Sequence, residues 1–109
     1  IFLEVIHMRT NCIRAIRNNT FNKLNLLMTL DLSNNRINSI DDNAFNGLVN
    51  LQILILENNT ISSIRNKHFE SLLSLKSLNL KTNRIISLQT DLFINLFNLE
   101  RLSLSFNLI

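Results

Sequence analysis

Apolar and polar residues alternate in short runs along the chain, and these runs return at a constant spacing of 24 residues. In each run apolar side chains occupy alternate positions, as Leu54 and Leu56 do, which predicts a short half-buried strand. Eight positions of this skeleton match in four successive units without insertion or deletion, and a fifth unit begins at Leu99. The third unit shows the skeleton as Leu51, Leu54, Leu56, Asn59, Ile61, Ile64, Phe69 and Leu72, and the first as Leu3, Ile6, Met8, Asn11, Ile13, Ile16, Phe21 and Leu24. Such regularity indicates a repeat architecture.

One unit cannot bury its apolar side chains alone, so neighbouring units must stack. Stacking places matching strands side by side, roughly 4.8 Å apart, in one parallel sheet whose leucine, isoleucine and phenylalanine side chains share an interior. We therefore expect a single array made of units 3–26, 27–50, 51–74 and 75–98, a partial unit 99–109, and no capping domain.

Two further columns need a structural role. An asparagine ends each expected strand, where the turning chain leaves backbone groups unpaired that a buried amide can satisfy. A phenylalanine follows ten residues later and fills the far side of each coil. The asparagine ladder is Asn11, Asn35, Asn59, Asn83 and Asn107, and the phenylalanine spine is Phe21, Phe45, Phe69 and Phe93.

The unit L-x-x-L-x-L-x-x-N-x-I/L with its distal phenylalanine resembles the leucine-rich repeat in its typical, extracellular subclass. The resemblance covers the whole chain and extends to fragments of Toll-like and other leucine-rich-repeat receptor ectodomains and of small leucine-rich proteoglycans. It implies an α/β-type solenoid, a right-handed horseshoe with one parallel sheet on the concave face and irregular or short helical convex segments. It also implies that the concave face meets a protein partner.

The residues between the strand leucines should point to that concave face. Unit by unit, they are Val5, His7, Arg9; Thr29, Asp31, Ser33; Ile53, Ile55, Glu57; Ser77, Asn79, Lys81; and Arg101, Ser103, Ser105. Ile53 and Ile55 form an apolar centre within a polar face, as in a small binding patch. The alternative is that β-branched residues simply suit strands. The ligand-binding candidates are Ile53, Ile55, Glu57, Asp31, Asn79, Lys81, His7 and Arg101.

The charged side chains on this face suggest neither catalysis nor metal binding. Glu57 and Lys81 share a column in adjacent units, so we expect an exposed ion pair worth about 0–1 kcal/mol. His7, Asp31 and Ser33 do not make a catalytic triad, because Ser33 and Asp31 should lie about 7 Å apart along one strand. His7, His68 and Cys12 lack metal-ligand spacing, and we expect His68 at the surface. No catalytic residue, metal or cofactor is expected.

Composition adds limits. The 109 residues are 46% hydrophobic with one glycine and no proline, and the net charge is +3. No basic stripe with interleaved aromatic residues is present, so nucleic acid is not an expected partner. No segment approaches the ~20 apolar residues of a membrane span, so any anchor would lie outside this sequence.

The sequence gives opposing indications of the cellular compartment. The chain starts in repeat register and stops within a unit, which suggests a fragment of a longer array. One unpaired cysteine counts slightly against secretion. Two glycosylation sequons, at Asn18 and Asn58, count for it.

Together these features favour a non-enzymatic protein-interaction module of an extracellular receptor, adhesion or matrix protein. The alternatives are an intracellular scaffold or adaptor, in which a free Cys12 is ordinary, and a leucine-rich module joined to an enzyme domain elsewhere.

Overall fold

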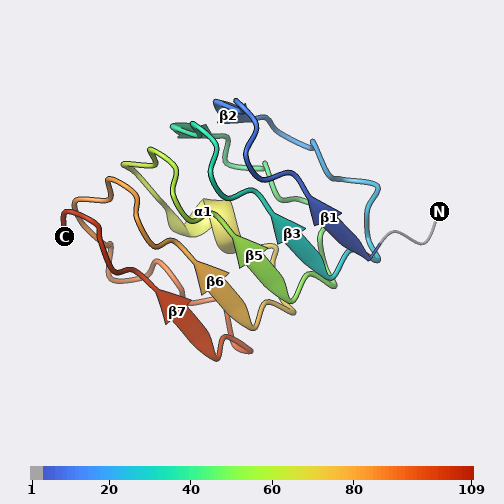
Figure 1. Ribbon diagram of the computed structural model, residues 1–109. Helices are drawn as coiled ribbons and strands as arrows, with labels where there is room; N and C mark the ends of the chain where they lie inside the picture. Colours follow the sequence, from blue (N-terminus) through green and yellow to red (C-terminus); the bar gives the residue numbers. More distant parts are fainter. Residues whose placement is uncertain (1–3) are drawn as a thin grey trace.

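The computed structural model describes residues 4–109, so the expectation for Leu3 lies outside the described residues. It is a parallel-strand solenoid of about four turns (Figure 1). The main sheet holds five strands in the order β1-β3-β5-β6-β7. These strands are β1 (Val5–His7), β3 (Thr29–Asp31), β5 (Ile53–Ile55), β6 (Ser77–Asn79) and β7 (Arg101–Ser103).

Every strand pair keeps the period predicted from the sequence. Ile53 of β5 lies opposite Thr29 of β3 on one side and opposite Ser77 of β6 on the other. The partners differ by 24 residues at each step, so side chains of one column form a row across the sheet. The central residue of each inner strand, such as Leu54, is buried, because alternate side chains point into the coil.

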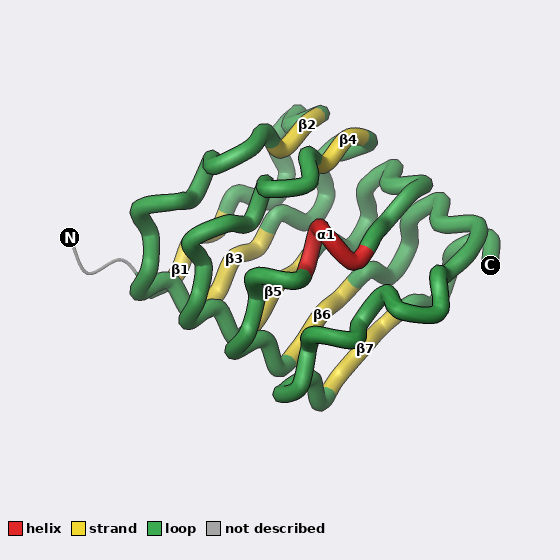
Figure 2. Tube along the Cα trace, turned by 180° about the vertical axis from the view of Figure 1, so that it is seen from behind, coloured by secondary structure: helices red, strands yellow, loops and turns green. Residues whose placement is uncertain are grey.

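The other side of the coil is mostly turns (Figure 2). A second sheet pairs β2 (Ala15–Ile16) with β4 (Ser39–Ile40). The single described helix, α1 (Asn66–Phe69), is one turn long. The prediction of irregular or short helical convex segments is confirmed.

The interior is a continuous column of leucine, isoleucine and phenylalanine side chains. The phenylalanine spine is present: the rings of Phe21 and Phe45 stack with centroids 6.4 Å apart, and those of Phe69 and Phe93 lie 6.1 Å apart. Phe45 and Phe69 have no exposed surface, whereas Phe93, in the last full turn, is only partly buried.

The asparagine ladder is confirmed in atomic detail. The side-chain oxygen of Asn59 accepts a hydrogen bond from the Ile37 backbone N–H at 3.0 Å. Its amide nitrogen donates to the carbonyl oxygens of Leu32, Leu56 and Glu57. Each inner asparagine therefore ties its own turn to the turn before it, which satisfies backbone groups that no strand reaches. Asn35, Asn59 and Asn83 are buried; Asn11, at the end of the stack, is exposed.

The residue before each ladder asparagine adopts the left-handed backbone conformation, with φ between 55° and 59°. The sequence pattern did not indicate this column, which is Thr10, Asn34, Asn58, Thr82 and Phe106. Gly47 also has a positive φ, 91°, and a Cβ there would lie 2.5 Å from the carbonyl oxygen of Asn22. The only glycine thus permits close approach of two turns.

Candidate ligand-binding face

The strands of the main sheet carry two of the three predicted columns of concave-face residues, and the third column lies two residues beyond the strand ends. Of the two residues predicted as an apolar centre, Ile53 is 39% exposed, and Ile55, two residues later on β5, is half-buried. Their row neighbours are Thr29 and Ser77 for Ile53, and Asp31 and Asn79 for Ile55. The rows place two aliphatic side chains between polar ones, as expected for a small patch with a polar surround.

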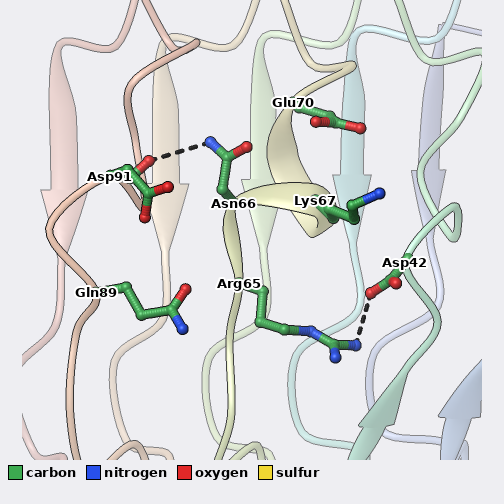
Figure 3. Close-up of a pocket in the computed structure, with 7 residues that line it drawn as sticks. All are labelled: Asp42, Arg65, Asn66, Lys67, Glu70, Gln89 and Asp91. Atoms are coloured by element: carbon green, nitrogen blue, oxygen red, sulfur yellow. Dashed lines mark hydrogen bonds and ion pairs between the residues drawn. The ribbon is translucent and has the colours of Figure 1, made fainter.

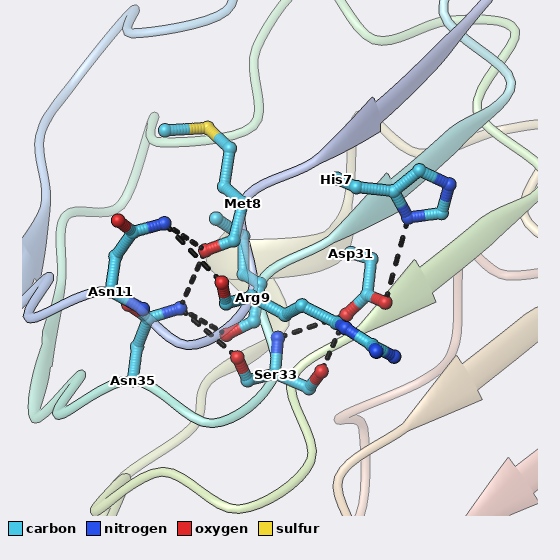
Figure 4. A network of polar contacts seen from close by, with 8 residues as sticks. His7, Met8, Arg9, Asn11, Asp31, Ser33 and Asn35 are labelled. Carbon is cyan, nitrogen blue, oxygen red and sulfur yellow. Dashed lines mark hydrogen bonds and ion pairs between the residues drawn. The ribbon is translucent and has the colours of Figure 1, made fainter.

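Asp31 differs from its prediction, because it is 6% exposed rather than an open ligand-binding carboxylate. One of its oxygens accepts hydrogen bonds from the Ser33 backbone N–H at 3.0 Å and from the Ser33 hydroxyl at 2.7 Å. The other lies 3.7 Å from Nδ1 of His7 on the next strand (Figure 4). The expected separation of about 7 Å is therefore wrong for the two side chains, because the strand ends at Asp31 and Ser33, beyond it, donates to the Asp31 carboxylate.

This network does not form a triad. The Ser33 hydroxyl donates to Asp31, whereas a nucleophilic serine would need a hydrogen bond to histidine. Burial alone would raise the pKa of Asp31, but the hydrogen bonds from Ser33 and the nearby His7 outweigh it and hold the pKa below its ordinary value. Asp31 is thus an ionised carboxylate that stabilises the turn.

The predicted ion pair between Glu57 and Lys81 is not formed. A Glu57 carboxylate oxygen instead accepts a hydrogen bond from the side-chain amide of Asn79 at 3.1 Å. The Lys81 ammonium lies over the ring of Phe106, 5.5 Å from its centroid. An amide and an aromatic ring, both one strand away, have replaced the opposite charges as partners. His7 and Arg101 are exposed, as expected for open positions of the face.

On the convex side a hollow of about 430 Å³ opens between three turns (Figure 3). Arg65 and Asp42 form an ion pair across it at 2.6 Å. Asn66 donates to the Asp91 carbonyl oxygen at 3.1 Å and to the Asn95 side chain at 3.1 Å. These contacts join successive turns, so the polar groups of this hollow serve to hold the array together.

His68 is not a surface residue: it is 3% exposed. Its Nδ1 accepts a hydrogen bond from the Arg65 backbone N–H at 3.0 Å, at the start of α1. The ring proton must then sit on Nε2, which has no hydrogen-bond partner and lies 3.8 Å from an oxygen of Asp42. The prediction failed because this position of the unit faces the interior whether or not the segment is helical: Ala44 and Leu92, 24 residues before and after His68, lie in turns and are also buried.

The glycosylation candidates Asn18 and Asn58 are both exposed, and so is the free thiol of Cys12. Asn18 accepts a hydrogen bond from the Asn43 backbone N–H at 2.9 Å, and Asn58 donates to Asn34 at 2.7 Å. Each of these hydrogen bonds leaves at least one hydrogen of the asparagine side-chain amide unused, so both side chains retain an N–H to which a glycan could be attached.

Within residues 4–109 no helix is both long and apolar enough to cross a membrane. The same residues contain no group of three or more histidine, cysteine, aspartate or glutamate side chains that could hold a metal ion.

Parallel strands in 24-residue register, an asparagine ladder and a phenylalanine spine define a class of solenoid that presents a sheet for binding. The family model described as "Leucine rich repeat" matches residues 2–61 and 49–109. The chain therefore belongs to the leucine-rich-repeat family. A search of curated protein sequences returned no match.

Two solved structures are similar in sequence and fold. One is TLR13 in a complex with ssRNA13, with 36% identity, a TM-score of 0.84, and 89% of this chain aligned to 14% of that chain. The other is Toll in a Toll–Spatzle complex from Drosophila, with 30% identity, a TM-score of 0.88, and 97% of this chain aligned to 16% of that chain. The chain thus spans about one seventh of the length of these receptors, and it is a leucine-rich-repeat interaction module like those of Toll-type ectodomains.

Proposed function

We propose that this chain is part of an extracellular or cell-surface receptor and binds a protein ligand on the concave sheet. The observation that carries the proposal is the position of Ile53 and Ile55, aliphatic side chains on the open face of the central strand. Backbone hydrogen bonds fix the sheet on both sides of β5, so little ordering entropy is lost when a partner docks. The Toll–Spatzle complex is a precedent for a protein partner in this family.

The test is a double substitution, Ile53→Asp with Ile55→Asp, in the 109-residue chain. A random peptide library is first selected on the parent chain, and the affinity of the selected peptides is then measured by biolayer interferometry. We expect the double variant to lose binding by at least about tenfold, because charges would replace the desolvated centre of the patch. Circular dichroism checks that the repeat fold is retained.

Ile86→Asp with Ile94→Asp is the matched control. These isoleucines are 64% and 65% exposed and lie outside the strands. The control should bind the peptides as the parent does. If it loses the peptides while the β5 variant keeps them, the binding face lies outside the sheet.

The extracellular location has its own test, because the exposed thiol of Cys12 favours the alternative, an intracellular scaffold. The chain is expressed behind a signal peptide in mammalian cells, with Thr20→Ala and Thr60→Ala variants to remove each sequon. Glycosidase-sensitive mass at Asn18 or Asn58 would show that the sequons can be used, as the extracellular location requires. A secreted chain without glycan at both sites would support the intracellular alternative.

A further inference from the structure

The acidic and the basic side chains of the concave face differ in whether they already have interaction partners. Its two carboxylates already have partners within the sheet: Asp31 is held by Ser33 and Glu57 by Asn79. By contrast, Arg9 and Arg101 are exposed, and neither forms an ion pair within residues 4–109. A partner approaching this face therefore meets cations that lack a counter-charge and anions that are already hydrogen-bonded.

The free cations flank the apolar centre. Arg101 lies in the same row as Ile53, two strands away through Ser77, which corresponds to about 9–10 Å. Arg9 follows β1, which is two strands from β5 on the opposite side. Lys81, over the Phe106 ring, lies after β6 and adds a third positive charge nearer to the centre. The acidic residues Glu4 and Glu100 directly precede β1 and β7 and lie at the strand-entry edge, outside the three columns of the face.

We infer that the partner is a protein segment that places an aliphatic or aromatic side chain on Ile53 and Ile55 and acidic side chains beside Arg9 and Arg101. The inference rests on the proposed function and specifies the chemistry of the ligand. The separation of about 9–10 Å between Arg101 and Ile53 corresponds to about three residues of an extended segment, which suits a segment that crosses the strands. Complementary charge of this kind sets the rate and orientation of encounter more than the final affinity.

A single-stranded RNA is the competing anionic partner. Among residues 4–109 the columns of the face offer a single aromatic ring, that of His7, on which a base could stack, whereas base stacking supplies much of the affinity for single strands. Its centre is aliphatic, which suits an apolar side chain better than a phosphate. The observations therefore favour a polypeptide.

The experiment uses three ligands on the 109-residue chain: a synthetic peptide with a central leucine flanked by glutamates, the same peptide flanked by lysines, and an oligouridine. Arg9→Glu with Arg101→Glu is the variant, and Arg36→Glu with Arg84→Glu, two exposed arginines outside the strands, is the matched control. Affinity is measured by fluorescence anisotropy at low and at physiological salt.

We expect the acidic peptide to bind at least about tenfold more tightly than the basic one, with a preference that shrinks as salt rises. The Arg9/Arg101 variant should lose this preference, and the Arg36/Arg84 variant should keep it. Equal binding of both peptides, abolished by Ile53→Asp with Ile55→Asp, would overturn the charge inference while leaving the binding face intact. Binding of neither peptide would overturn both proposals, and salt-dependent binding of oligouridine alone would identify a nucleic-acid partner.

Discussion

Single asparagine side chains perform a task in this molecule that secondary structure cannot. From Asn35 onward, each ladder amide bonds backbone groups of two successive turns, so we expect its contribution to stability to depend on the presence of a preceding turn. The side chain of Asn59, in the middle of the array, makes four hydrogen bonds, whereas within residues 4–109 the Asn11 side chain donates to Met8 and Arg9 alone.

Replacing Asn59 should therefore cost stability. We expect Asn59→Leu to lower the free energy of unfolding by at least about 1–3 kcal/mol, because buried carbonyl and N–H groups lose their partners. Urea denaturation measures the change. Asn11→Leu, at an exposed position, should cost less, and equal effects of the two substitutions would contradict the ladder as a source of stability.

Backbone strain before the ladder offers a stabilising change. Thr82 holds a φ of 57°, a conformation that β-branched residues adopt at a cost and asparagine tolerates. Thr82→Asn should raise stability by on the order of 1 kcal/mol. The new amide would also continue the contact in which Asn58 donates to Asn34. Thermal melting tests this, with Thr90→Asn as a control at an ordinary φ; a melting temperature that falls for Thr82→Asn would reject it.

At the scale of elements, the one-turn helix α1 changes the convex side. It begins after Arg65, whose backbone N–H donates to Nδ1 of His68, and its residues His68 and Phe69 are buried. Arg65 also reaches Asp42 in the turn before, so the start of α1 is linked to the preceding unit by a side-chain ion pair. A titratable ring thereby becomes part of the packing.

Acid should weaken this link. Burial lowers the pKa of His68, the positive charge of Arg65 lowers it further, and Asp42 opposes them only partly. The unfolded chain then binds the proton more readily, so the contribution of His68 is fully present above about pH 6.5 and is lost as pH falls toward the folded pKa. Protonation would also remove the acceptor at Nδ1. Urea denaturation at pH 7.5 and 5.5 should show a larger loss for the parent than for His68→Asn; identical losses would contradict this assignment.

The phenylalanine spine should behave as core. Phe69 has no exposed surface and touches His68 and Phe93 rings, so Phe69→Ala should cost about 3–5 kcal/mol through lost burial and a cavity. Phe97→Ala, at an 82% exposed ring, is the matched control and should change stability by no more than about 0.5 kcal/mol. Chemical denaturation compares them, and an unchanged midpoint for Phe69→Ala would rule out a packed spine.

For the whole molecule, burial depends on the number of neighbouring turns. Leu56 and Leu80 have no exposed surface, whereas Met8 in the same column of the first described turn is 36% exposed. At the other end Leu102 is 39% exposed although its counterparts Leu54 and Leu78 are buried. The two outer strands, β1 and β7, each pair on one side only.

The isolated chain should consequently self-associate. An unpaired parallel strand edge beside exposed apolar side chains favours end-to-end addition of a second copy, which is an open, head-to-tail contact. Analytical ultracentrifugation over a concentration series should show mass increasing with concentration. Leu102→Lys should reduce it by charging the exposed end of the stack. A monomer at all concentrations would show that the ends are better protected than their exposure suggests.

The sequence by itself determined the period, the strand register, the asparagine ladder and the phenylalanine spine. These follow from a strict repeat, because a residue that recurs every 24 positions must meet its own counterpart when units stack. Ile53 and Ile55 were placed on the open face by the same two-residue alternation.

Only the tertiary structure decided which polar side chains are free. Asp31 is buried and accepts from Ser33, His68 is buried beside Phe69, and Glu57 is bonded by Asn79 rather than by Lys81. Such outcomes depend on where each strand ends and how the chain bends there. The repeat pattern fixes which residues are neighbours, but local backbone geometry selects the side-chain atoms that meet, and therefore which charges remain for a ligand.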